Sequence, residues 1–153
     1  GEGLDCAIRF GDGHWHGTEA TPLLRAPLAP VCAPALAARI RSVRDLGRET
    51  LLRSYRPEEW LEWFRAAGAP PPLLTGPLFD SSLVLADAAA QGAGVALLPV
   101  KLFGRDLQSS RLVRLFDVEV DVGGYWLTRL KRRRSSAAMR AFSEWVVKQS
   151  QPA

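Results

Sequence analysis

The chain has 153 residues, of which 47% are hydrophobic and 24% are charged, which is typical of a globular protein with a buried core. No apolar run approaches the roughly 18 residues that a membrane span needs, and the first residues lack the segments of a secretory signal, so we expect a cytoplasmic protein without a membrane partner. The net charge is +4, but the one basic run, residues 131–134, has no interleaved aromatic residues and is expected to be a solvated connection, not a nucleic-acid site.

The first part of the chain is predicted to be largely extended. Residues 4–10 have the pattern of a short strand, which the glycine-rich residues 11–13 close. Residues 23–32 form a second extended segment, and its prolines favour an edge strand or a crossing between lobes over the centre of a sheet. Residues 4–10 look like an interior strand, and because a domain seldom starts on one, we expect the N-terminal part of the fold to precede residue 1.

Helices and strands are predicted to alternate after this segment. Helices begin at Pro34 and at Pro57, with a strand at residues 50–55 between them. The second of these helices is the clearest in the chain and ends before Gly68. Its core-facing residues are predicted to be Trp60, Leu61 and Phe64.

Residues 77–100 are predicted to form one β-α-β unit. A strand ends at Asp80, an alanine-rich helix follows and stops at Gly92, and residues 94–98 form an apolar run of the kind that a buried parallel strand needs. In open α/β sheets ligands bind beside the carboxyl ends of the strands, where the helix N-terminus favours an anionic group.

Two hydroxyl groups stand at the start of this helix. Ser81 or Asp80 is explained by helix capping alone, which stabilises a helix by about 1 kcal/mol. Ser82 lies one residue inside the helix and is not needed for capping. Its hydroxyl is therefore a candidate hydrogen-bond partner for a ligand carboxylate.

The last third contains shorter elements. A short helix is predicted over residues 101–107, and strands over residues 112–116 and 125–130. Ser135 and Ser136 then cap a final helix. The stripe through which this helix is expected to pack consists of Met139, Phe142 and Val146, with Trp145 at its margin.

Support for catalysis or metal binding is thin. The only histidines, His14 and His16, share one loop, and their spacing lacks the further ligands of a metal site. Cys6 and Cys32 are widely spaced within apolar segments and predict buried thiols, not a disulfide framework. We therefore expect no enzyme activity, no metal and no cofactor.

Other polar side chains have two interpretations each. Tyr125 follows two glycines at the start of a strand, where a phenol either seals a core edge or stands over a cleft with its hydroxyl free. Thr18 and Tyr55, together with Arg53 and Arg56, could line the same cleft or belong to ordinary surface.

Several motifs resemble the effector-binding domain of LysR-type transcriptional regulators, and the resemblance covers essentially the whole chain. The residues that resemble the whole family are 80–82, 88–97 and 141–145. Those that resemble the narrower AmpR/PenR group of β-lactamase regulators are 7–10, 15–20, 51–56 and 125–130.

The resemblance implies an α/β fold of two Rossmann-like subdomains joined by two crossover strands, like a type 2 periplasmic binding protein, with the N-terminal part of subdomain I missing. Residues 1–26 and 126–153 would form the partial regulatory subdomain I, and residues 27–125 regulatory subdomain II. Residues 23–32 and 125–130 look like the crossings, and the effector would occupy the cleft between the subdomains.

The resemblance also implies control of a chromosomal β-lactamase gene by cell-wall muropeptides. UDP-N-acetylmuramyl pentapeptide would be the repressing ligand and anhydromuramyl peptides the activating ligands. Ser82 and Tyr125 match effector-contacting residues of the group, and Ser81, Thr18 and Tyr55 complete the predicted effector-binding set. A threonine and an aspartate that complete the site in relatives would lie before residue 1.

Such regulators act as homodimers or higher homo-oligomers and contact DNA only through an N-terminal winged helix-turn-helix domain, which this sequence does not contain. The alternative is a periplasmic-type small-molecule binding protein, or a hydrolase, that uses the same cleft. A helix-turn-helix encoded upstream would favour the regulator, whereas a signal peptide would favour the receptor.

Overall fold

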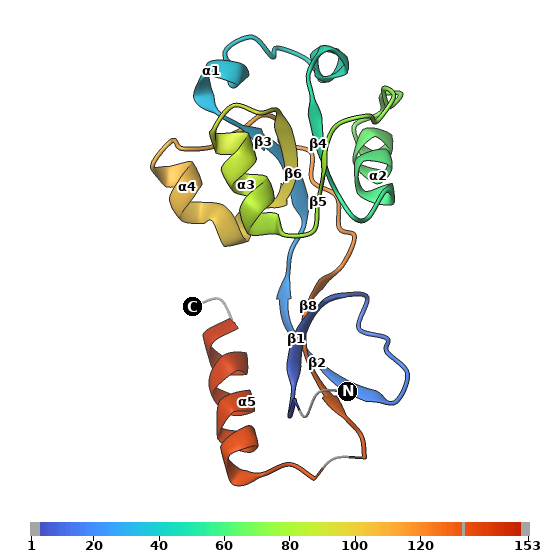
Figure 1. Ribbon diagram of the computed structural model, residues 1–153, viewed down its shortest axis with the longest axis vertical. Coiled ribbons are helices and arrows are strands. Elements are labelled where there is room, and N and C mark those ends of the chain that lie inside the picture. The colour runs from blue at the N-terminus through green and yellow to red at the C-terminus, as the bar shows by residue number, and fades with distance from the viewer. Residues whose placement is uncertain (1–3, 133, 151–153) are drawn as a thin grey trace. The chain divides into compact units, whose positions relative to one another are not determined.

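The computed structural model describes residues 4–132 and 134–150 of the chain (Figure 1). The chain divides into two compact units. Unit 1 consists of residues 1–26 and 121–153, and unit 2 of residues 27–120. Among the residues that the structure describes, no helix is both long and apolar enough to cross a lipid bilayer.

Unit 1 is an antiparallel sheet with one helix. Its central strand β8 (Gly124–Leu130) pairs on one side with β1 (Ala7–Gly11) and on the other with β2 (Thr18–Arg25). Helix α5 (Ala137–Ser150) contacts β2. The buried side chains of Leu127, Met139 and Val146 form the small core of this unit.

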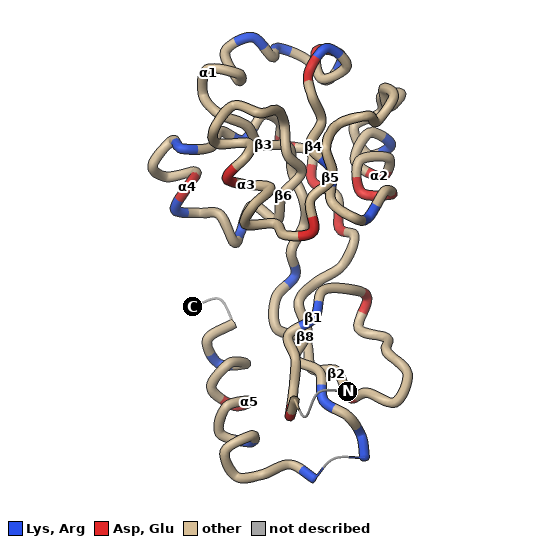
Figure 2. The backbone as a smooth tube through the Cα atoms, in the orientation of Figure 1, with Lys and Arg blue, Asp and Glu red and all other residues tan. Residues whose placement is uncertain are grey.

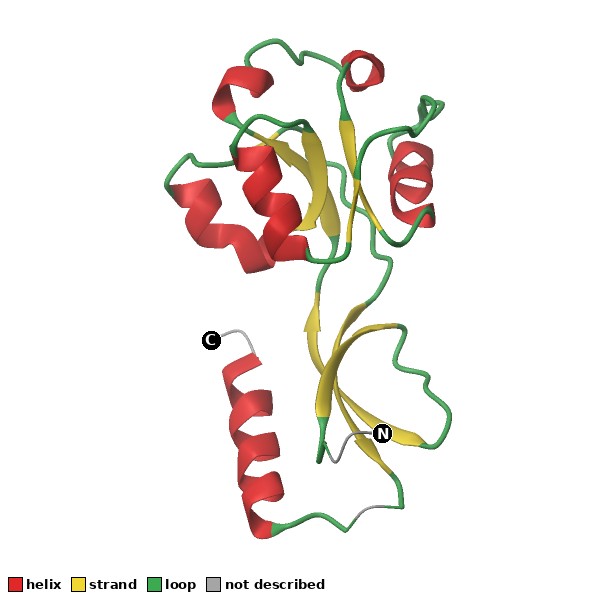
Figure 3. Ribbon diagram, viewed as in Figure 1, coloured by secondary structure: helices red, strands yellow, loops and turns green. Residues whose placement is uncertain are grey.

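Unit 2 is a mixed five-stranded sheet with the strand order β5-β4-β6-β3-β7 (Figure 3). The strands β5, β4 and β6 are mutually parallel, and β3 pairs antiparallel with both β6 and β7. The strands are β3 (Leu28–Cys32), β4 (Leu51–Ser54), β5 (Leu78–Phe79), β6 (Val95–Pro99) and β7 (Val113–Arg114).

The helices of unit 2 connect these strands. They are α1 (Pro34–Ala37), the 3₁₀ turn η1 (Val43–Arg48), α2 (Glu58–Ala66), α3 (Ser82–Ala90), the 3₁₀ turn η2 (Val100–Phe103) and α4 (Gly104–Gln108). The crossover through α2 connects β4 to β5 at the edge of the sheet, and the crossover through α3 connects β5 back to β6. Because such crossovers are right-handed, the two helices lie on opposite sides of the sheet (Figure 1).

The core of unit 2 lies between α3, β6 and their neighbours. Every residue of β6 is buried, as its uninterrupted apolar sequence predicts. Helix α3 packs its Leu85, Ala86 and Ala89 side chains into the same cluster. The predicted β-α-β unit at residues 77–100 is therefore confirmed.

Two helices differ from the predicted burial. In α2 the Leu61 side chain is 43% exposed, whereas Trp63, which was not predicted to face the core, is fully buried. Trp60, Trp63 and Phe64 follow the i, i+3, i+4 spacing of one helical face, and Leu61 lies outside that face. In α5 the Phe142 side chain is 40% exposed, so the predicted stripe buries only part of its length.

Residues 23–32 were predicted to be an edge strand or a crossing between lobes and not the interior of a sheet, and the exclusion of an interior position is wrong for the second half of this segment. β3 lies between β6 and β7, and all five of its residues are buried. Pro30 is tolerated there because β7 is only two residues long and pairs with Val31 and Cys32. The Pro30 carbonyl still accepts a hydrogen bond from the amide of Leu115.

Charged residues are distributed over the chain, as Figure 2 shows. In the basic run Lys131, Arg132 and Arg134 are exposed, which agrees with a solvated connection, and Arg133 lies outside the described residues. Cys32 is buried as predicted, whereas Cys6 is partly exposed because it precedes β1.

Candidate functional site

The carboxyl ends of β4 and β5 form one edge of the unit 2 sheet. Ser54, the last residue of β4, pairs in parallel with Phe79, the last residue of β5. Tyr55 and Asp80 therefore leave the sheet side by side, and Ser81 and α3 follow directly. This is the edge at which ligands bind in open α/β sheets.

Ser81 and Ser82 occupy the N-terminus of α3 as the sequence predicts. Ser81 has the extended conformation of an N-cap residue, with φ −130° and ψ 127°, and its carbonyl accepts the amide of Leu85 at 2.9 Å. Its hydroxyl makes no capping hydrogen bond, so the predicted side-chain cap is wrong and the cap is made by the backbone alone. Ser82 is the first helical residue, and both serines are half-buried.

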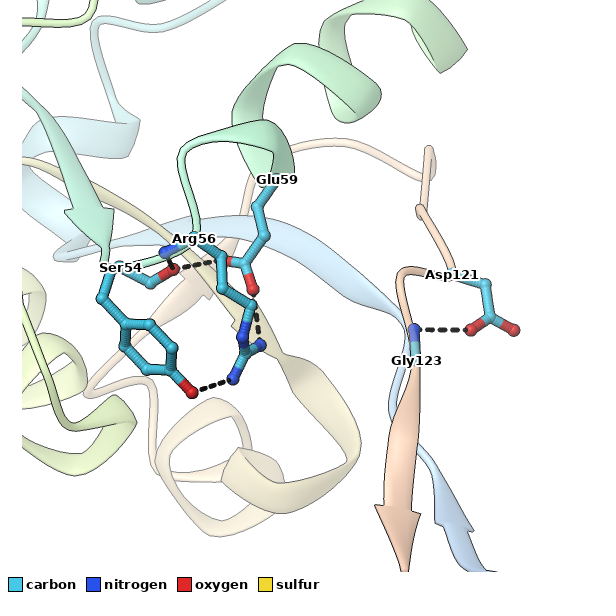
Figure 4. Close-up of polar contacts among 6 residues, drawn as sticks. Ser54, Arg56, Glu59, Asp121 and Gly123 are labelled. Atoms are coloured by element: carbon cyan, nitrogen blue, oxygen red, sulfur yellow. Dashed lines mark hydrogen bonds and ion pairs between the residues drawn. The ribbon is translucent and has the colours of Figure 1, made fainter. Parts of the chain in front are cut away.

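A polar cluster of Ser54, Tyr55, Arg56 and Glu59 lies at the end of β4, and Figure 4 labels Ser54, Arg56 and Glu59. Tyr55 is exposed, and its hydroxyl oxygen accepts a hydrogen bond from Arg56 Nη2 at 3.0 Å. Arg56 Nη1 lies 2.7 Å from Glu59 Oε1, and the Ser54 hydroxyl donates to Glu59 Oε2 at 2.6 Å. The cluster therefore links a buried carboxylate to a surface phenol.

Glu59 is the one buried acid in the described part of the chain, at 4% exposure. Burial raises the pKa of Glu59 because the charged form loses hydration, while the hydrogen bond from Ser54 and the charge of Arg56 act in the opposite direction. In the sequence, Glu59 is only an acid in the first turn of the helix that begins at Pro57, where it suits the helix dipole. The signal that could have revealed its role is the cation three residues earlier, since Arg56 and Glu59 form an i, i+3 pair.

Arg53 has a different partner. Its Nε donates to the Gly76 carbonyl at 2.7 Å, and its amide donates to the Pro77 carbonyl at 2.9 Å. The side chain therefore fastens the segment that leads into β5.

In unit 1, Tyr125 lies at the start of β8 beside a pocket of about 450 Å³. The ring of Tyr125 meets the ring of Phe10 edge to face, with centroids 5.2 Å apart, so the phenol both packs on the sheet and borders an opening. The pocket is lined by Gly11, Asp12, Pro22, Leu23, Leu24, Arg25, Asp121, Gly123, Gly124, Tyr125 and Trp126.

Charged groups at this pocket are paired with each other. Arg25 forms an ion pair with Asp121, whose second oxygen accepts the Gly123 amide at 3.3 Å (Figure 4). A cation and an acid therefore flank the glycines from which β8 starts.

Thr18 is not brought together with Tyr125 within this unit. Thr18 pairs with Leu130 at one end of β8, while Tyr125 lies at the other end, about 16 Å away at the usual rise of a strand. The Thr18 hydroxyl contacts the His16 carbonyl at 3.4 Å.

The loop with both histidines is exposed. The His14 amide donates to Asp12 Oδ1 at 2.9 Å, which is a local turn interaction. Across residues 4–132 and 134–150, no three His, Cys, Asp or Glu side chains are grouped so that they could hold a metal ion.

Comparison with known proteins identifies the family. Residues 1–151 match the LysR substrate binding domain. The chain belongs to this family. Its α/β class and the two-subdomain, periplasmic-binding-protein-like fold predicted from the sequence are thereby confirmed.

Relatives with similar sequences include transcriptional activators. The chain is 54% identical over 149 residues to the HTH-type transcriptional activator AmpR of Rhodobacter capsulatus. The aligned region covers 97% of this chain and 52% of that protein. The chain thus spans about half the length of the curated relatives it matches.

Solved LysR-family structures agree in fold. The effector domain of AmpR from Pseudomonas aeruginosa is 52% identical, with a TM-score of 0.93 over 97% of this chain and 73% of that one. The Citrobacter freundii effector binding domain with three substitutions, at a threonine, a serine and a tyrosine, is 42% identical, with a TM-score of 0.94 over 98% of this chain and 77% of that one.

Proposed function

We propose that this chain is the effector-sensing part of a LysR-type transcriptional regulator that controls β-lactamase expression in response to cell-wall muropeptides. Membership of the family supports a role in binding a small effector. The names of its relatives support a transcriptional role in the AmpR group over catalysis.

Ser82 and Tyr125 are the residues that we assign to effector contact, and one observation carries this assignment. In the substituted Citrobacter freundii domain, the altered serine and tyrosine are separated by the same number of residues as Ser82 and Tyr125. Both side chains also have suitable surroundings, since Ser82 opens α3 and Tyr125 borders the pocket of unit 1.

The chemistry of these positions suits an acidic peptide. A helix N-terminus presents backbone N–H groups and the positive end of the helix dipole, and a serine hydroxyl there adds one more donor. A phenol at a pocket rim donates to an acceptor while its ring provides apolar contact. Muropeptides offer both carboxylates and apolar methyl groups.

The rest of the proposal concerns the intact protein. Residues 1–26 with 126–153 would belong to regulatory subdomain I and residues 27–125 to subdomain II. DNA contact would be made by a separate helix-turn-helix domain, the regulator would work as a homo-oligomer in the cytoplasm, and the ligand would shift the population of existing states without chemistry.

Calorimetric titration of the intact protein with UDP-N-acetylmuramyl pentapeptide and with an anhydromuramyl peptide tests the proposal. We expect saturable binding of both ligand classes, and weaker binding after Ser82→Ala or Tyr125→Phe. If neither ligand binds to the folded parent protein, the proposed function is wrong.

A further inference from the structure

Tyr55 is an exposed aromatic residue that the neighbouring Arg56 side chain contacts. Its side chain is 56% exposed at the carboxyl edge of β4, next in register to the segment that opens α3. The Arg56 guanidinium donates to its hydroxyl oxygen at 3.0 Å and also lies over its ring, 4.8 Å from the ring centroid. The Tyr55 ring is therefore held by a charged neighbour.

The Arg56 side chain is itself held by an ion pair with the buried Glu59. The Arg56 side chain is 24% exposed and that of Glu59 only 6% exposed, and the two are joined by an ion pair of 2.7 Å. Ser54 completes the arrangement, because its hydroxyl donates to Glu59 while its oxygen accepts the Arg56 amide at 3.0 Å. The guanidinium is therefore fixed by Glu59 in the first turn of α2, and Glu59 is held in turn by the last residue of β4 (Figure 4).

A buried acid at this position needs an explanation. Burying a carboxylate costs free energy even when it is paired, and an apolar residue would fill the same space without that cost. Burial raises the pKa of Glu59, while Arg56 and Ser54 stabilise its charged form, and these contacts hold the guanidinium in one place.

The arrangement fixes the direction of the Tyr55 hydroxyl group. A phenol oxygen that accepts an N–H from a cation directs its own O–H elsewhere, and the accepted bond polarises that O–H and strengthens it as a donor. At an exposed position, the partner of this donor has to come from solution.

We propose that Tyr55 donates a hydrogen bond to a carboxylate of the effector, and that Glu59 and Arg56 are positioning residues that orient its hydroxyl. This inference rests on the proposed function and adds a contact in unit 2 to that of Ser82. A carboxylate is preferred over a phosphate because both proposed ligand classes contain carboxylates, whereas only the UDP-linked one contains phosphate.

The test is a double-mutant cycle on the intact protein, read by calorimetry with UDP-N-acetylmuramyl pentapeptide. We expect Tyr55→Phe to weaken binding about 10-fold, the usual effect of losing one hydrogen bond to a charged group. Glu59→Gln is expected to weaken binding in the parent but to have no further effect in the Tyr55→Phe background. Effects that simply add would overturn the positioning role.

Controls separate this inference from folding defects and from failure of the proposed function. Glu58→Gln makes the same change of charge at the adjacent exposed residue and should leave affinity unchanged. Should Glu59→Gln unfold, Arg56→Lys replaces it in the cycle, since lysine keeps the charge but lacks the planar fork that reaches both partners.

The outcomes are distinct. A parent protein that binds neither muropeptide overturns the proposed function, whereas binding that Tyr55→Phe leaves unchanged overturns this inference alone. A second titration with an anhydromuramyl peptide should show the same loss, and a loss confined to the UDP-linked ligand would overturn the assignment to a carboxylate.

Discussion

The rings of Phe10 and Tyr125 meet at an interplanar angle of 76°, edge to face, across the pairing of β1 with β8. The two residues are direct partners in that antiparallel register, so the position of the Tyr125 ring is set by packing within the sheet. The hydroxyl can therefore be removed without removing the contact that holds the ring.

Tyr125→Phe is expected to separate binding from stability. The ring contact with Phe10 survives, so the variant should stay folded, while affinity for UDP-N-acetylmuramyl pentapeptide should fall about 5- to 10-fold with the loss of one hydrogen bond. Calorimetry and thermal melting of the intact protein measure both quantities. Unchanged affinity would remove Tyr125 from the effector site.

Two serines at helix N-termini are expected to respond differently to alanine. The Ser136 hydroxyl accepts the Met139 amide at 3.1 Å, so Ser136→Ala should cost about 1 kcal/mol of the free energy of unfolding. Ser81 makes no such bond, so Ser81→Ala should cost only a few tenths. Urea unfolding of both variants makes the comparison, and equal losses would contradict the assigned caps.

Two glycines are expected to give changes of opposite sign. A Cβ at Gly76 would lie 1.9 Å from the Leu51 carbonyl oxygen, so Gly76→Ala must displace backbone and should destabilise the protein by about 3 kcal/mol. Gly104 has φ −56° and open space around its Cβ position, so Gly104→Ala should stabilise it by about 0.5 kcal/mol. Chemical denaturation of the two variants tests both signs.

The two cysteines should differ in reactivity. Burial, with a smaller contribution from the charge of Glu49, raises the pKa of Cys32 from 9.0 to about 11, whereas Cys6 is partly exposed. Iodoacetamide at pH 8 should therefore modify Cys6 well before Cys32, because the thiolate is the reactive form. Mass spectrometry of the native protein reads both sites, and equal rates would contradict the burial of Cys32.

The same pKa shift predicts how stability depends on pH. The folded state keeps the Cys32 proton up to about pH 11, whereas the unfolded state loses it near pH 9.0, so the free energy of unfolding should fall as pH rises between these values. Cys32→Ala should remove this part of the slope. A slope that persists in that variant would have to come from other groups.

Local pattern was sufficient for much of unit 2. The apolar residues of β6, the serines that open α3 and the proline at the start of α1 were all predicted correctly, because each depends on residues close in sequence. The burial of Trp63 in place of Leu61 was missed, since spacing defines a helical face but not which of two overlapping faces meets the core. The interior position of Pro30 was missed for a related reason. A proline is tolerated in β3 because its neighbour β7, which lies far along the chain, is short.

The sequence by itself determined the order of the elements, the helix tip at Ser82 and the family, because periodicity, capping residues and family motifs are local properties of the chain. Only the tertiary structure decided which distant segments meet. β1 joins β8 across more than a hundred residues, and the Trp126 indole donates to the Gly11 carbonyl to close the Tyr125 pocket. The tertiary structure also decided the environment of Glu59. Strand register and burial determine which charged groups lose hydration and which neighbours stabilise those groups, and no local sequence pattern encodes register or burial.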